Sequence, residues 1–476
     1  MLYNSSDTLK GRYFMFEIDK LLKEIKRIHF IGIGGSGMCP LAEILHKKGY
    51  VLSGSDNNET DTLARIRSLG IPVTMGQKAE NISGAEMIVY TAALLPDNPE
   101  LVAAKASGIP TFERSKLLGA ITRIYPNSIC ICGTHGKTTA CSMLTQVLIE
   151  ADFDPTAVIG GKLPLTGTNG IVGHSEHMVC EACEFVDTFL DLSPDIAVIL
   201  NVDEDHLDYF KTFENLKKSF TKFATMATKM IIYNGDDLNT VDAVVPAVEI
   251  CNKPVITFGL NDENIYQAVN VELKNEFASF ELVRYGEKLG KVTLGIPGKH
   301  HVYNALAVIA SAMESGVSFD QCVKGIADFH GAGRRFEILA EIDGITIADD
   351  YAHHPKELEV TLNTAMKMGY NKVWAVFQPF TYSRTAILFD EFVRVLKIPD
   401  YCIMTEIMGS REVNTYDIYT SQLAEKIPGS VWFNEFEEVA EYAVNNARKG
   451  DLIITLGCGD IYKAAKIMIK MLKERQ

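Results

Sequence analysis

The sequence predicts an α/β protein of three domains whose sheets are mostly parallel. Its 476 residues are enough for about three domains of ordinary size. Short apolar runs of strand length alternate with segments of helical spacing, which is the rhythm of a parallel sheet. The polar loops that follow these runs divide the chain into three blocks, which we place at 1–126, 127–333 and 334–476.

Composition and charge exclude several classes of protein. Apolar residues make up 47% of the chain and charged residues 22%, as in globular rather than disordered proteins. With 46 basic against 61 acidic residues the net charge is −15, so no excess of lysine and arginine remains for general nucleic-acid binding. No apolar run reaches about 18 residues and the N-terminus lacks a signal-peptide pattern, which predicts a cytoplasmic protein without membrane insertion.

The ten cysteines form no regular framework. Cys180 and Cys183 are spaced as CxxC, but no second pair follows at the spacing of a zinc ribbon. We therefore expect reduced thiols, most of them buried in apolar runs.

The first block begins with a helix and a strand. Phe16–Arg27 carries apolar residues at helical spacing, and His29–Ile33 follows as a strand. Met38–Lys47 is predicted as a helix, and Ala85–Tyr90 is a later strand of the same block.

A glycine-rich loop joins this first strand to its helix. Gly32, Gly34 and Gly37 form the pattern GxGxxG, which lets a nucleotide phosphate approach the backbone at a helix N-terminus. Asp56 lies 22 residues past Gly34, where an acidic side chain suits a ribose hydroxyl. The pattern alone fits a nicotinamide oxidoreductase nearly as well as any other nucleotide-binding protein, and a tight turn without a ligand is the other alternative.

The second block opens with a sharper motif. The strand Ser128–Cys132 runs into GTHGKTT, Gly133 to Thr139, and an amphipathic helix follows. Lys137 suits the β- and γ-phosphates of a nucleotide and Thr138 suits Mg²⁺, although Ile131 stands where the common motif has another glycine. This shortened phosphate-binding loop predicts ATP or GTP with Mg²⁺.

Two further strands of the second block end in groups that suit a metal ion. Glu181 follows Met178–Cys180 directly. Asp205 and His206 lie just beyond the strand Ile196–Leu200. Hard oxygen ligands with one imidazole at the carboxyl ends of neighbouring strands fit Mg²⁺, whereas a purely structural histidine is the alternative.

The third block follows a glycine-rich segment that suits a hinge, Gly331 to Glu337. Its predicted strands are Ile345–Ala348, Val373–Phe377 and Leu452–Leu456. The first strand ends in DDYAHHP, which suggests binding because no nucleophile is present. The second ends near Arg384, a candidate clamp for a carboxylate or phosphate, and the third ends in LGCGD, which also suits a plain turn.

The ordered set of motifs resembles one family, the Mur ligases. The motifs are GIGGSGM, GSD, GTHGKTT, EACE, DEDHLDYF, GRRFE, DDYAHHP, FQPFTYSRT and LGCGD, and they extend from His29 to about Lys463. The resemblance implies a Rossmann-like N-terminal domain for a UDP-sugar, a central ATP-binding domain, and a Rossmann-like C-terminal domain that brings the amino acid. Residues 1–25 lie outside it and are assigned no function.

The resemblance also implies a reaction of peptidoglycan precursor synthesis. ATP phosphorylates the lactyl carboxylate of UDP-N-acetylmuramate, and the amine of L-alanine attacks the acyl phosphate. The expected partners are these small-molecule substrates, and we expect the protein to be a monomer or a homodimer.

The family pattern carries over to this chain residue by residue. The implied ATP-binding set is Gly133, Thr134, His135, Gly136, Lys137, Thr138, Thr139, Asn304, Arg335 and Asp350. The implied UDP-sugar set is Gly32, Gly34, Gly35, Ser36, Gly37 and Asp56. The implied Mg²⁺ ligands are Thr138, Glu181 and His206, and the implied catalytic set is Lys137, Glu181, His206 and Arg384.

The chain also departs from the family pattern. Phe380 and Thr381 stand where a histidine and an arginine are usual at the amino-acid end, and Cys183 replaces an aspartate. Glycine, serine or a tripeptide as acceptor, and a non-catalytic ATP-binding protein, therefore remain alternatives. Some Mur ligases carry a carbamylated lysine, and Lys217, Lys218 and Lys222 are all within range, so spacing selects none of them.

Overall fold

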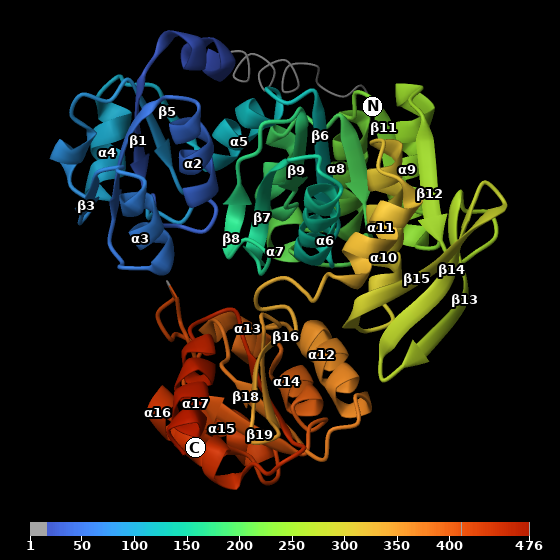
Figure 1. The fold of residues 1–476 in the computed structure, drawn as a ribbon. Coiled ribbons are helices and arrows are strands. Elements are labelled where there is room, and N and C mark those ends of the chain that lie inside the picture. Colours follow the sequence, from blue (N-terminus) through green and yellow to red (C-terminus); the bar gives the residue numbers. More distant parts are fainter. Residues whose placement is uncertain (1–16, 411, 476) are drawn as a thin grey trace. The chain divides into compact units, whose positions relative to one another are not determined.

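A computed structural model describes residues 17–410 and 412–475, apart from the side chain of Asp208. The chain forms two compact units (Figure 1). The first takes in most of the chain up to Phe329. The second runs from His330 and includes the short segments Glu272–Ala278 and Gly295–Lys299. Within the described residues no helix is both long and apolar enough to cross a bilayer.

The first unit begins with a helix at 17–24 and a five-stranded sheet in the order β3-β2-β1-β4-β5. All four pairings of this sheet are parallel. Its strands are β1 (Arg27–Ile31), β2 (Val51–Asp56), β3 (Val73–Met75), β4 (Met87–Tyr90) and β5 (Thr111–Glu113). The helices between them are α2 (Cys39–Lys47), α3 (Asp61–Ser68), the 3-10 turn η1 (Ala79–Ile82), α4 (Pro99–Ala106) and α5 (Arg114–Thr122).

A ten-stranded sheet forms the centre of the same unit, in the order β15-β14-β13-β12-β11-β10-β6-β9-β7-β8. The strands are β6 (Asn127–Cys132), β7 (Thr156–Leu163), β8 (Thr168–Ile171), β9 (His177–Glu181), β10 (Ile196–Ile199), β11 (Met230–Asn234), β12 (Val255–Gly259), β13 (Tyr266–Lys274), β14 (Phe277–Arg284) and β15 (Glu287–Pro297). The helices are α6 (Lys137–Glu150), η2 (Phe185–Asp191), α7 (Leu207–Phe210), α8 (Phe213–Thr225), α9 (Leu238–Cys251), α10 (His301–Glu314) and α11 (Phe319–Ala327).

The second unit contains a six-stranded sheet in the order β16-β17-β21-β18-β19-β20. Only the β16–β17 pairing in it is antiparallel. The strands are β16 (Glu337–Ile342), β17 (Ile345–Asp350), β18 (Val373–Phe377), β19 (Tyr401–Thr405), β20 (Val431–Phe433) and β21 (Leu452–Leu456). The helices are α12 (Pro355–Lys367), α13 (Tyr382–Ile387), α14 (Phe389–Val395), α15 (Thr420–Lys426), α16 (Phe436–Asn446) and α17 (Tyr462–Glu474).

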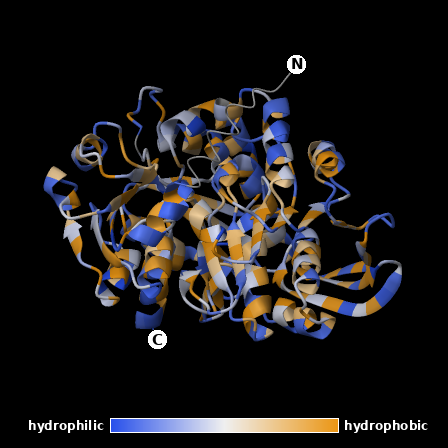
Figure 2. Ribbon diagram, turned by 90° about the horizontal axis from the view of Figure 1, so that it is seen from above, coloured by the Kyte–Doolittle hydropathy of each residue, from blue (hydrophilic) through white to orange (hydrophobic). Residues whose placement is uncertain are grey.

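The central strands of the ten-stranded and six-stranded sheets are almost entirely apolar because helices cover both faces of these sheets. Every residue of β10, β18 and β21 is buried. In Figure 2 the strands inside the molecule are mostly orange or white, whereas the helices around them carry both orange and blue residues. The predicted α/β fold with mostly parallel sheets is confirmed. The first strand begins at Arg27, earlier than predicted, so the predicted helix over Phe16–Arg27 is too long at its C-terminal end.

One buried polar network supports the first sheet. His29 on β1 and Glu100 on α4 are 2% and 0% exposed, and Nε2 of His29 lies 2.7 Å from Oε1 of Glu100. Glu100 Oε2 accepts hydrogen bonds from the hydroxyl of Ser55 (2.7 Å) and the amide of Asn81 (3.2 Å). Because its polar groups are partnered, the network holds β1, β2, η1 and α4 together without an unsatisfied buried charge.

Candidate active site

The loop between β6 and α6 places Lys137 over its own backbone. Nζ of Lys137 donates to the carbonyls of Gly133 (2.5 Å) and Thr134 (3.0 Å) and pairs with the buried Glu184 at 2.9 Å. Burial lowers the pKa of Lys137, but the carboxylate of Glu184 and other nearby anionic groups outweigh it, so the pKa is raised above its usual range. Lys137 is therefore a fixed cation at a helix N-terminus, which is a site for phosphate.

The polar segment after β10 holds the other end of this loop. Asn201 accepts from the N–H of His135 (2.8 Å) and donates to its carbonyl (3.0 Å). The hydroxyl of Thr134 accepts from the N–H of Asp203 (2.9 Å). The segment after β10 thus holds the loop that follows β6. In the sequence, the only sign of this role for Asn201 is its place directly after a buried strand.

Glycine at position 136 leaves room for a side chain of α10. Gly136 has φ +83°, and a Cβ there would lie 2.6 Å from Oδ1 of Asn304. Asn304 is 5% exposed and bonds the ring of His301 at 3.0 Å. The structure thus brings Asn304 to the loop from 168 residues away in the chain, because α10 packs against α6.

Thr138 and Glu181 meet at the same sheet edge. The Thr138 hydroxyl donates to Oε1 of Glu181 (2.9 Å), and the N–H of Gly160 on β7 donates to Oε2 (2.6 Å). No group of three or more His, Cys, Asp or Glu within 17–410 and 412–475 is arranged to hold a metal ion alone. A hydroxyl and a carboxylate still fit Mg²⁺, which usually takes one or two protein oxygens and completes its shell with phosphate and water.

His206 reaches the same region through Glu184. Its Nε2 lies 3.9 Å from Oε1 of Glu184, and its ring packs on Phe185 with centroids 4.7 Å apart. Glu184 therefore joins Lys137 to His206, a role that the sequence analysis missed although Glu184 ends the motif EACE. The pKa of Cys183 is raised, first by burial and then by Glu184, so this thiol stays neutral beside the lysine.

The predicted UDP-sugar residues also lie together in the first sheet. Oδ2 of Asp56 at the end of β2 accepts from the N–H of Gly34 (2.9 Å), and Oδ1 accepts from the N–H groups of Asn57 and Asn58. The carbonyl of Ser36 accepts from Asn169 on β8 at 2.5 Å. Asp56 therefore shapes the glycine loop directly. Its predicted contact with a ribose stays a prediction.

The predicted residues of the third block lie in the second unit. Asp350 ends β17, where its carboxylate accepts from the N–H groups of Phe336 (2.7 Å) and Ala352 (2.7 Å). Arg335 packs on the ring of Tyr351 at 5.1 Å. Arg384 lies on α13, and its Nη1 is buried without a hydrogen-bond partner among the described residues. An unpaired buried guanidinium nitrogen suits an anionic ligand.

Two neighbouring features of this unit bear on the departures from the family pattern. Phe380 packs edge-on against His353 with ring centroids 6.4 Å apart. Thr381 has φ +65° and caps α13 by accepting from the N–H of Arg384 (3.4 Å). Thr381 thus has a structural role in holding the helix that carries Arg384.

Burial makes Asp350 sensitive to pH. It raises the pKa of Asp350 to about 6 from 3.8, although the charge of Arg335 and two backbone N–H groups act in the opposite direction. The folded state therefore holds this proton more tightly than the unfolded state. The resulting stability is fully present below about pH 4 and is lost as the pH rises through about 6.

We expect Asp350→Asn to flatten this dependence. Measured by denaturant unfolding between pH 4 and 7, the unfolding free energy of the wild type should fall relative to that of the variant by about 2 kcal/mol. Parallel curves for the two proteins would show that Asp350 titrates normally.

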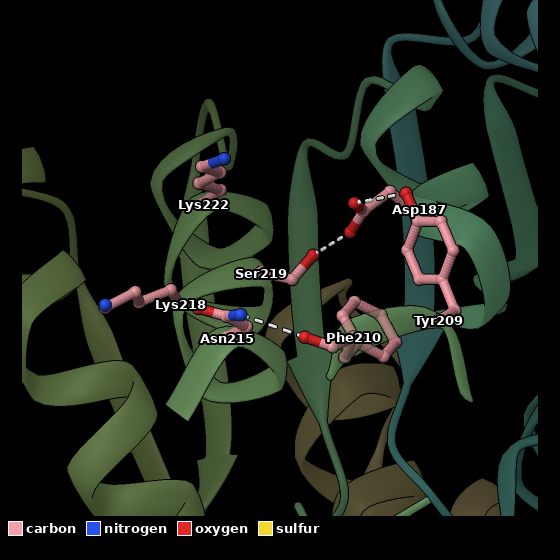
Figure 3. Close-up of a pocket in the computed structure, with 7 residues that line it drawn as sticks. All are labelled: Asp187, Tyr209, Phe210, Asn215, Lys218, Ser219 and Lys222. Atoms are coloured by element: carbon pink, nitrogen blue, oxygen red, sulfur yellow. Dashed lines mark hydrogen bonds between the residues drawn. The ribbon is translucent and has the colours of Figure 1, made fainter. Parts of the chain in front are cut away.

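The three candidate lysines of α8 differ in their surroundings. Lys217 pairs with Asp242 (2.8 Å) and Glu214 (3.1 Å). Lys218 and Lys222 instead line a pocket of about 450 Å³ (Figure 3). The other lining residues are Asp187, Tyr209, Phe210, Asn215 and Ser219. In Figure 3 the amines of Lys218 and Lys222 point in different directions, so they do not converge on one point. The hydroxyl of Ser219 points away from both amines and donates to the carboxylate of Asp187.

Together these features define a class: an α/β protein with three sheets, whose central sheet carries a glycine-rich loop with Lys137 next to the carboxylates of Glu181 and Glu184. Three family models match it, described as "Mur ligase family, catalytic domain" (27–125), "Mur ligase middle domain" (131–312) and "Mur ligase, glutamate ligase domain" (334–459). The chain belongs to the Mur ligase family, as its motifs indicate.

Several relatives of this chain carry the name of one enzyme of the family. UDP-N-acetylmuramate–L-alanine ligase of Acetivibrio thermocellus is 42% identical over 455 residues, which cover 94% of this chain and 96% of the relative. The enzyme of that name from Caldanaerobacter subterraneus is 39% identical, with 97% and 100% covered. The crystal structure of UDP-N-acetylmuramate–alanine ligase from Thermotoga maritima matches with a TM-score of 0.81 and 25% identity, covering 95% of this chain and all of that one.

Proposed function

We propose that this chain joins L-alanine to the lactyl carboxylate of UDP-N-acetylmuramate in peptidoglycan precursor synthesis. ATP phosphorylates the carboxylate and leaves as ADP, and the amine of L-alanine then displaces phosphate from the acyl phosphate. The names of its relatives support this substrate pair. The observation that carries the proposal is the arrangement of Lys137 on its loop beside the bonded pair of Thr138 and Glu181. That arrangement is suited to phosphoryl transfer, which is needed because a free carboxylate is a poor electrophile.

In this proposal each group of the central sheet has one role. Lys137 binds the transferred phosphate and offsets its charge. Thr138, Glu181 and His206 hold Mg²⁺, which supplies further charge stabilisation when bound. Glu184 fixes the positions of Lys137 and His206 through its two oxygens. In the first unit Asn304 contacts the nucleotide. In the second unit Arg335 and Asp350 have the ATP contacts, and Arg384 the amino-acid contact, that the family pattern implies.

The test is phosphate release with ATP, Mg²⁺ and UDP-N-acetylmuramate, with each amino acid added singly. We expect release to rise sharply with L-alanine and to require the UDP-sugar. Faster release with glycine, serine or a tripeptide would keep the ligase chemistry and move the acceptor specificity to the region of Phe380 and Thr381. Release that ignores every added acceptor would favour a non-synthetic ATP-binding protein.

A further inference from the structure

Three elements near Glu184 and His206 are tied together by the carboxylate of Asp187. This residue lies in η2 and is partly buried. Its Oδ2 accepts a hydrogen bond from the phenol hydroxyl of Tyr209 on α7 (2.9 Å), and its Oδ1 accepts one from the hydroxyl of Ser219 on α8. Figure 3 shows both bonds, so one carboxylate joins η2, α7 and α8.

Each end of the Asp187–Tyr209 bond leads by one tight turn to a residue of the candidate active site. The carbonyl of Glu184 accepts from the N–H of Asp187 (2.9 Å), and the carbonyl of His206 accepts from the N–H of Tyr209 (3.0 Å). Nε2 of His206 in turn lies 3.9 Å from Oε1 of Glu184. The two turns and the two side-chain contacts therefore close a ring, in which Asp187 and Tyr209 lie opposite Glu184 and His206.

The backbone of both turns is strained. Val186, Asp187 and His206 have φ of +53°, +58° and +53°. Non-glycine residues rarely adopt this left-handed conformation, and for a β-branched valine it is a clear outlier. Such a conformation persists only where the surrounding structure holds it. A turn that loses its link to the other turn can relax, and the side chain at its start then moves.

Helix α8 is the support to which the ring is attached. Ser219 is 4% exposed, and Asn215, one helical turn earlier, donates to the carbonyl of Phe210 at the end of α7 (2.9 Å). The rings of Phe189 on η2 and Phe223 on α8 stack with centroids 4.9 Å apart. The later part of η2 is thus held in the apolar core, whereas its first residues are held by the polar link.

We propose that Asp187 is a positioning residue, which holds Glu184 and His206 in the arrangement that phosphoryl transfer requires. The inference rests on the proposed function for the roles of Glu184 and His206, and it adds the part of the chain that keeps them in place. Asp187 acts only through these two side chains. Its loss therefore lowers the turnover rate and weakens the dependence on Mg²⁺, but leaves the binding of the UDP-sugar unchanged.

The experiment compares Tyr209→Phe, Asp187→Ala and Asp187→Asn in the full-length protein. Since each of the first two removes a hydrogen bond to a charged group, we expect both to lower kcat on the order of tenfold. The Mg²⁺ concentration for half-maximal rate should rise several-fold, and the KM for the UDP-sugar should stay constant. Asp187→Asn should retain most of the rate, because its amide can accept from one hydroxyl and donate to the other.

Tyr266→Phe is the matched control. It also removes a tyrosine hydroxyl that donates to a carboxylate, that of Glu314 (2.7 Å). Tyr266 lies on β13, which is four strands away from β6 in the same sheet. We expect this variant to have the kcat and the Mg²⁺ dependence of the wild type.

A double variant separates positioning from a general effect on stability. His206→Asn introduces a residue type that tolerates the left-handed backbone at this position. Tyr209→Phe should cause little further loss of kcat in His206→Asn, because both changes act through the same side chain. Additive losses would overturn the inference, as would wild-type kinetics in Tyr209→Phe or equal losses in Asp187→Asn and Asp187→Ala.

A measurement without nucleotide or metal tests the link independently of the proposed function. The ring-proton resonances of His206 are identified by NMR from their absence in His206→Asn. They should shift in Tyr209→Phe and stay unchanged in Tyr266→Phe. A wild type that releases no phosphate with any amino acid would refute the proposed function, whereas unshifted His206 resonances in Tyr209→Phe would refute the positioning role of Asp187.

Discussion

Replacing Lys137 with alanine is expected to lower phosphate release by about a thousandfold or more, since removal of one fixed cation from a phosphoryl-transfer site has effects of this order. No other lysine lies in the loop, and the two carbonyl contacts of Nζ fix its position before substrate binds. The measurement is the initial rate of phosphate release with saturating ATP, UDP-sugar and L-alanine. Retention of more than about a tenth of the wild-type rate would contradict the role given to Lys137.

A stability control separates chemistry from folding in this experiment. Lys137→Ala leaves the buried carboxylate of Glu184 without its cation, which costs about 3–5 kcal/mol for a buried pair. The double variant Lys137→Met with Glu184→Gln removes both charges and should recover most of that stability. It should remain inactive, so a stable but inactive double variant assigns the loss of activity to the missing lysine.

Replacing Glu181 with glutamine is expected to reduce kcat about a hundredfold and to raise the Mg²⁺ concentration for half-maximal rate about tenfold. The amide fits the same space: its oxygen accepts from the N–H of Gly160, and its NH₂ group donates to the hydroxyl of Thr138. The fold is therefore preserved while the anionic ligand is lost. Mg²⁺ titrations of the rate provide the measurement.

The matched control for this prediction is Glu150→Gln at the far end of α6. Glu150 accepts a hydrogen bond from Gln146 and lies thirteen residues beyond Lys137, more than three helical turns away. We expect its Mg²⁺ dependence to equal that of the wild type. Identical Mg²⁺ dependence in Glu181→Gln and Glu150→Gln would show that Glu181 is not a ligand.

The sequence predicted best what depends on local pattern. The buried strands β10, β18 and β21 read as apolar runs because both of their faces are covered, and the groups that follow parallel strands meet at one sheet edge. Lys137 and Thr138 were predicted from the loop after one strand and Glu181 from the end of another, and the structure brings Thr138 and Glu181 into contact. Their roles stay predictions.

Other parts of the site depend on geometry that no pattern records. Glu184 comes just before a turn in which Val186 and Asp187 have φ of +53° and +58°, and this left-handed backbone is rare for a β-branched residue such as valine. Asn201 reaches the loop that follows β6 only because β10 is the neighbour of β6 in the sheet. Sequence spacing does not specify strand order, so neither residue was predicted.

The buried pair of His29 and Glu100 has a consequence for how this domain changes over generations. Loss of either residue alone strands the other in the core, whereas replacing both with apolar side chains of similar volume is often neutral. A single substitution of His29 or Glu100 therefore gives an unstable protein, so we expect the two positions to change together or not at all. The two residues lie 71 positions apart in the sequence. A chimera of two related proteins with its crossover between these positions would therefore combine a residue 29 and a residue 100 that were not selected to pack together.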